Sequence, residues 1–152
     1  MISGKDIADT ARTYIGVRYR HHGRTRGKGV DCVGLVILVA RDLGLKQAGG
    51  YSNLDYAVAP DEEMMGRELR ANLIEVPISE MREGDIAWFA VPDRRTKTSI
   101  ARHLAIITMH PSVKGDFGMV HAMDYVGFVA EHHLDATWKK RIKSVFRYRG
   151  TE

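Results

Sequence analysis

One stretch near the start of the chain limits the possible folds more than any other. From residue 32 to residue 43 almost every side chain is apolar, and these side chains cover all sides of a helical wheel. A helix of this kind must be buried on every side, and Gly44 is placed to end it. The run is far shorter than the roughly 20 apolar residues of a membrane span, so we expect a buried central helix and no membrane insertion.

The segments around this helix predict further helices and a loop. Ser3 precedes apolar residues at helical spacing, which predict a helix over residues 4–15. Residues 17–31 contain several glycines and basic side chains without a sustained period, which predicts a long irregular loop. Pro60 and Asp61 introduce a helix that runs to Asn72, and its acidic start suits the positive end of the helix dipole.

After Pro77 the pattern changes to short segments of β type separated by turns. Residues 135–140 are expected to form a short helix or a turn. Helices first and strands afterwards predict an α+β fold, in which N-terminal helices and the buried central helix pack on a C-terminal antiparallel sheet of about five or six strands. With 152 residues, 44% of them apolar, the chain is expected to form a single domain over residues 1–152. The expected strands are residues 85–90, 102–109, 117–123, 126–132 and 143–149.

The chain has a single cysteine, which excludes an intrachain disulfide and a zinc site made of cysteines. Cys32 follows Asp31 at the point where the loop becomes the buried helix, so its thiol is expected in the first helical turn. The unpaired N–H groups there lower the pKa of a thiol from its usual value of about 8.5, which makes Cys32 a candidate nucleophile. An inert buried cysteine is an equally good interpretation of position alone, and Gly34 favours the nucleophile slightly because it lets another element approach.

A cysteine nucleophile needs a base, and the base needs a partner that orients it. His103 begins one apolar strand and His121 lies inside the next. If residues 110–116 close a hairpin in which Ile107 pairs with Phe117, the two histidines lie directly opposite each other, with Cβ atoms about 4.5 to 5.5 Å apart. This register predicts an imidazole pair, and a slip of one residue would separate the rings.

Each histidine also has a simpler interpretation. His103 and His121 alone would be half-buried strand residues, and a metal site built from them and Cys32 lacks the fourth ligand that structural zinc requires. We therefore expect no metal and no cofactor. The other histidines are expected to be solvated: His21, His22, His110, His132 and His133.

The net charge of +4 and a sequence pI near 9.3 favour contact with anionic partners. The basic loop between Arg18 and Lys28 is a candidate for nucleic-acid binding, which a salt-dependent gel shift would test. Runs of this kind are more often solvated loops, and we expect no nucleic-acid partner.

Five short segments in order resemble the NlpC-type cell-wall cysteine peptidases, in particular the stand-alone members found in phage tails and gene transfer agents. The resemblance spans nearly the whole chain and implies a papain-like fold. It also implies a thiol protease of the cell wall, a hydrolase that cuts peptidoglycan stem peptides between D-γ-glutamyl and the diamino acid. The segments are Gly16-Val17-Arg18-Tyr19-Arg20, Asp31-Cys32-Val33-Gly34-Leu35-Val36, Glu83-Gly84-Asp85-Ile86, His103-Leu104-Ala105-Ile106 and Val120-His121-Ala122.

The resemblance implies a role for each matching residue. Cys32 corresponds to the nucleophile, His103 to the base and His121 to the orienting third member. Tyr19 resembles the tyrosine that contributes to the oxyanion site or positions the substrate.

The chain departs from the commonest family pattern in three places. Val33 replaces the serine after the cysteine, Arg18 replaces the proline before the tyrosine, and Leu104-Ala105 replaces the Val-Gly after the histidine. We expect Arg18 and Val33, together with Asp31, to touch the substrate groove and to influence which bond is cut.

No secretion signal is visible in residues 1–10, so we expect synthesis in the cytoplasm and action at the cell wall after delivery by a phage or phage-like particle. The expected partners are stem peptides and phage tail proteins, and a toxin exported by a contact-dependent system would look the same. The alternative from another class is a catalytically idle module that binds the wall or builds the tail. A Cys32 thiol that resists iodoacetamide at neutral pH would favour this idle module.

Overall fold

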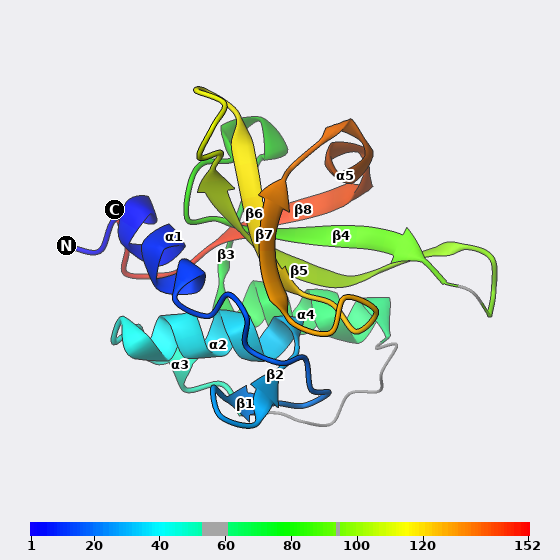
Figure 1. Cartoon of the computed structure of the whole chain (residues 1–152), viewed down its shortest axis with the longest axis horizontal. Helices are drawn as coiled ribbons and strands as arrows, with labels where there is room; N and C mark the ends of the chain where they lie inside the picture. The colour runs from blue at the N-terminus through cyan, green and yellow to red at the C-terminus, as the bar shows by residue number, and fades with distance from the viewer. Residues whose placement is uncertain (53–60, 94) are drawn as a thin grey trace.

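A computed structural model describes residues 1–52, 61–93 and 95–152 of the chain. Its centre is a six-stranded antiparallel sheet in the order β3-β8-β4-β5-β6-β7. Helices α2 and α4 lie against one face of this sheet, α1 lies at one end and α5 lies on the opposite face (Figure 1). The predicted α+β architecture is confirmed.

The first two helices start as the sequence predicts. α1 (Gly4–Arg12) begins at Ser3, whose side chain and that of Asp6 each accept a hydrogen bond from the other residue's backbone N–H. α2 (Cys32–Asp42) begins at Asp31, which accepts a bond from the Gly34 N–H at 2.7 Å. Residues 34–40 are all buried, so the prediction of a helix enclosed on every side is confirmed. Gly44 adopts a φ of 73°, the left-handed geometry that ends a helix.

Of the remaining helices, two are confirmed as predicted and one was not predicted. α4 (Glu62–Asn72) confirms the predicted third helix and is capped by Asp61, while Pro60 lies outside the described residues. α5 (Ala136–Arg141) confirms the short helix or turn. α3 (Lys46–Gly49) and a 3₁₀ turn (Ile78–Glu80) were not predicted.

All five predicted strands are present with shifted ends. A sixth, β3 (Ile74–Val76), was not predicted because it spans three residues, too few to show a period of two. The loop before α2 also contains a two-stranded ribbon of β1 (Arg24–Thr25) and β2 (Gly29–Val30). The five predicted strands are β4 (Ile86–Pro92), β5 (Ser99–Met109), β6 (Phe117–Ala122), β7 (Val129–His133) and β8 (Ile142–Arg147).

The predicted register of the β5–β6 hairpin is wrong by two residues. Ile107 pairs with Met119, and Phe117 pairs with Met109. The two strands stay paired up to Met109, the last residue of β5. The turn that connects them is therefore shorter than the predicted register implies. A shift of two leaves every side chain on its expected face, whereas a shift of one would reverse them.

The sheet separates two apolar clusters of unequal size. The larger, here called the helical face, packs α1, α2 and α4 on strand residues such as Trp88, Leu104 and Val120. The smaller, here called the α5 face, is covered by Leu134 and Trp138. No helix in the described part of the chain is long and apolar enough to cross a membrane.

Candidate active site

A gap opens in the sheet where β5 and β6 separate. Their ladder ends at the pair Ile106 and Val120. Beyond that pair His121 bonds with β7, while His103 pairs with Phe89 of β4. A small pocket of about 60 Å³ lies at this divergence. Its lining residues come from both faces of the sheet: Tyr19, Cys32, Val91, Arg102, His103, Ala122, Met123 and Asp124.

Cys32 reaches the pocket from the helical face. It is the first residue of α2, is half-buried, and packs against the larger apolar cluster. Its Sγ lies 4.0 Å from the carbonyl oxygen of Arg102. Within the described residues no hydrogen bond joins Sγ to His103.

The thiol is not acidified by its place at the helix start. Burial, followed by the carboxylate of Asp31, raises the pKa of Cys32 to about 12, and the nearby amides of Leu104, Val33 and Cys32 itself lower it less strongly. The expectation of a lowered thiol pKa is therefore wrong. It considered the helix dipole but not the loss of water around the sulfur.

His103 and His121 project from the α5 face and meet across the gap. Nε2 of His103 lies 2.7 Å from Nδ1 of His121, so the predicted contact exists although the predicted register does not. Burial holds the pKa of His103 well below 6.5, and the neighbouring His121 acts in the same direction. Burial and then His132 lower the pKa of His121 to about 3. Both rings are therefore neutral at pH 7.

A third histidine continues the pair to the surface, and the sequence interpretation missed it. His132 on β7 is exposed, and its Nε2 lies 2.6 Å from Nε2 of His121. Its Nδ1 lies 2.9 Å from the carbonyl oxygen of His133. The ring of Trp138 lies 5.9, 5.5 and 5.8 Å from the rings of His103, His121 and His132. The β6–β7 register, with His121 opposite Ala130, was the signal that would have placed His132 on the same face.

Tyr19 and Arg102 add polar side chains to the pocket wall. Tyr19 is half-buried, and burial followed by the charges of Cys32 and Asp31 raises the pKa of its hydroxyl, which stays protonated and can donate. Nε of Arg102 is buried and has no hydrogen-bond partner among the described residues. Arg102 was also missed, because it lies in a strand where an arginine ordinarily faces solvent.

The three residues expected in the substrate groove, Arg18, Asp31 and Val33, are not among the lining residues of the small pocket. Asp31 is buried, and its carboxylate accepts bonds from the N–H groups of Gly34 and His22 and from Arg24 at 2.7, 2.9 and 3.0 Å. Arg18 is exposed and its backbone bridges to Phe128.

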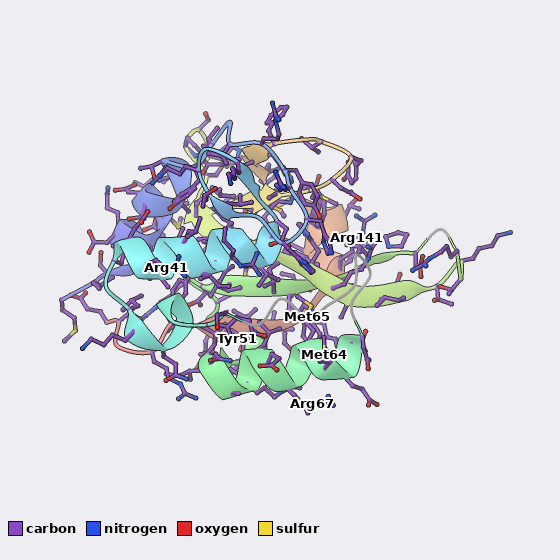
Figure 2. All side chains as sticks on the ribbon, turned by 90° about the horizontal axis from the view of Figure 1, so that it is seen from below. Arg41, Tyr51, Met64, Met65, Arg67 and Arg141 are labelled. Carbon is purple, nitrogen blue, oxygen red and sulfur yellow. The ribbon has the colours of Figure 1, made fainter. Side chains whose placement is uncertain are left out.

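Val33, the third of them, lines a second cavity of about 80 Å³. This cavity is almost entirely apolar, and the labelled Tyr51, Met64 and Met65 lie along the space between α2 and α4 where it is found (Figure 2). Its polar lining residues are Tyr51, Glu68 and Asn72, and its lining holds neither a cysteine nor a histidine. The smaller pocket at the sheet gap, which brings Cys32 and His103 together, is therefore the candidate site. Across residues 1–52, 61–93 and 95–152, no group of three or more His, Cys, Asp and Glu side chains is arranged to hold a metal ion.

Comparisons with known proteins bear on the fold. No protein-family model matches the chain, and no curated protein matches its sequence. A crystal structure from Staphylococcus aureus subsp. aureus Mu50, described as similar to a lipoprotein of the NLP/P60 family, superposes with a TM-score of 0.58 at 20% identity. The match covers 95% of this chain and 41% of the staphylococcal chain. The chain therefore has the papain-like fold of an NLP/P60 protein and spans less than half the length of that protein.

Proposed function

We propose that this chain is a cysteine peptidase that hydrolyses amide bonds of peptidoglycan stem peptides, with the bond between D-γ-glutamyl and the diamino acid as its first target. One observation carries the proposal: Cys32 at the start of a buried helix shares a pocket with His103, whose Nε2 lies 2.7 Å from Nδ1 of His121. A nucleophile, a base and an orienting group are the parts that thiol-dependent acyl transfer requires. The likeness in fold to an NLP/P60 protein supports the substrate class.

Before substrate binds, the thiol of Cys32 and the imidazole of His103 are both neutral, and the mechanism must start from this state. The thiol has a pKa of about 12 and the pKa of His103 lies well below 6.5, so a thiolate and an imidazolium do not form in advance. Nδ1 of His103 takes the thiol proton as Sγ attacks the amide carbon. The Tyr19 hydroxyl and the amides at the start of α2 stabilise the oxyanion that forms.

The second half of the reaction returns the enzyme to its starting state. The tetrahedral intermediate collapses, the C–N bond breaks, and His103 gives its proton to the leaving amine. A thioester between Cys32 and the acyl group remains. Water then attacks the thioester with His103 as base, which releases the carboxylic acid and restores the thiol.

A second function is favoured by the state of the thiol. The raised thiol pKa and the missing hydrogen bond between Cys32 and His103 in the described chain suit an idle module that binds wall polymer without cutting it. We further propose that a phage or phage-like particle delivers the protein to the wall. Phage tail genes beside its own gene would support this route, and genes of a contact-dependent export system would contradict it.

The deciding experiment incubates purified muropeptides with the wild type and with Cys32→Ala and identifies the products by mass spectrometry. We expect a new amine and a new carboxylate at the D-γ-glutamyl bond with the wild type only. Products that form equally with both proteins, or with neither, would defeat the peptidase. Retained binding to insoluble peptidoglycan without products would instead support the idle module.

A further inference from the structure

A backbone carbonyl fixes the proton positions at the outer end of the histidine series. Nδ1 of His132 lies 2.9 Å from the carbonyl oxygen of His133. A carbonyl oxygen can only accept, so Nδ1 of His132 must carry the hydrogen. In a neutral ring the other nitrogen is then unprotonated. Nε2 of His132 therefore acts as an acceptor toward His121.

This constraint passes inward through two hydrogen bonds. Nε2 of His121, 2.6 Å from Nε2 of His132, must carry a hydrogen, which leaves Nδ1 of His121 unprotonated. Nε2 of His103, 2.7 Å from that Nδ1, must then carry the hydrogen in turn. Nδ1 of His103 is left unprotonated, and within the described residues no group hydrogen-bonds to it.

We infer that His132 is a positioning residue that sets the tautomer of His103 and so prepares its Nδ1 to accept the thiol proton. The inference rests on the proposed peptidase function. The pair of His103 and His121 alone does not choose between its two arrangements, because each makes one hydrogen bond. In the reversed arrangement Nδ1 of His103 carries the hydrogen and cannot act as a base.

In the two buried rings, His103 and His121, charge does not select between the two arrangements. Burial keeps His103 and His121 neutral, so each ring has one donor and one acceptor nitrogen. Trp138 of α5 packs against all three rings, which limits the access of water that would otherwise exchange the protons. His132 is the member of the series that is exposed and also bonded to a fixed acceptor.

Two substitutions of His132 test whether the direction of its hydrogen bond to His121 matters. His132→Lys offers only donors and would reverse the hydrogen bonds, whereas His132→Gln can still accept through its amide oxygen. We expect the Lys variant to lose about 100-fold or more in kcat for the stem peptide, the usual contribution of a positioned base, with KM unchanged. The Gln variant should stay within about tenfold of the wild type. Thr137→Lys, at an exposed position of α5, adds the same charge outside this series and should retain activity.

A measurement without substrate tests the inference independently of hydrolysis. ¹⁵N NMR of the histidine-labelled full chain reports which ring nitrogen carries hydrogen. We expect protonated Nε2 and unprotonated Nδ1 for His103 in the wild type and the Gln variant, and the reverse in the Lys variant. A wild type with hydrogen on Nδ1 of His103, or a Lys variant with unchanged tautomer and activity, would overturn the inference. The expected tautomers in a protein that cuts no muropeptide would defeat the peptidase alone.

Discussion

The two faces of the sheet differ in how thickly helices cover them and in which functional groups they contribute to the site. The helical face buries the larger cluster beneath α1, α2 and α4 and supplies the thiol of Cys32. The α5 face has a small cluster beneath one short helix and supplies the imidazoles. The two sets of groups share one pocket because β5 and β6 separate at the site. The thick layer of helices on the helical face can hold the nucleophile rigidly. The thin layer on the α5 face leaves room for the series of histidine rings that ends at the surface.

A matched pair of core deletions tests the difference in thickness most strongly. Leu35 on the helical face and Leu134 on the α5 face are both fully buried. We expect Leu35→Ala to lower the free energy of unfolding by about 4 kcal/mol and Leu134→Ala by about 2 kcal/mol, because a thin layer collapses more easily around a cavity. Urea denaturation measures both. Equal losses would show that the α5 face is packed as rigidly as the helical face.

Acid should destabilise the protein through the α5 face. The pKa of His121 is lowered to about 3 in the folded protein, so between that pH and 6.5 the unfolded chain binds more protons. The stability contributed by the neutral ring is complete above pH 6.5 and is lost as the pH falls. From pH 6.5 to pH 4 this amounts to about 3 kcal/mol.

Below pH 4 Asp116, whose pKa is lowered to about 2 by His133, would add its own loss, so the measurement stops there. Denaturation midpoints across this range should show a slope that His121→Asn reduces but does not abolish, because the pKa of buried His103 is also held well below 6.5. His110→Asn is the control, because its ring accepts backbone bonds in a turn that asparagine can also cap. If the slope in His121→Asn equals that of the wild type, burial of the His121 ring does not contribute to it.

We expect the side chain of Trp138 to contribute to catalysis as well as to the packing of the α5 face. Its ring covers all three histidines, so Trp138→Leu should admit water to the two bonds between imidazoles. We expect kcat/KM to fall about tenfold, equivalent to about 1.4 kcal/mol, and the pKa of His121 to rise toward 6.5. NMR titration and muropeptide kinetics measure the two effects. Phe117→Leu, in the same cluster but without these ring contacts, should change neither.

The sequence predicted what depends on local pattern and missed what depends on neighbours. The all-apolar run after Cys32 could only be an enclosed helix, and Ser3 and Asp61 marked helix starts that the structure confirms. The alternation in β5 and β6 placed their histidines on one face, but a period of two cannot distinguish registers that differ by two residues.

The sequence pattern also could not predict effects that depend on contacts between residues distant in the chain. The thiol pKa was wrong because the desolvation of Cys32 comes from elements distant in sequence. His132 was assigned to solvent because its partner lies across an unpredicted register. The catalytic roles of Cys32, His103 and His121 stay predictions.

We expect the smallest effect from a substitution of Val33, a residue of the helical face that is next to Cys32 in the chain but takes no part in the proposed reaction. Val33 follows Cys32 in the chain, yet its side chain lines the apolar cavity between α2 and α4. Val33→Ala should therefore lower the free energy of unfolding by about 1 kcal/mol, in line with the apolar surface removed. Muropeptide kinetics should show kcat/KM within about twofold of the wild type. A change in which bond is cut would support the prediction that Val33 touches the substrate groove and would place part of that groove on the helical face.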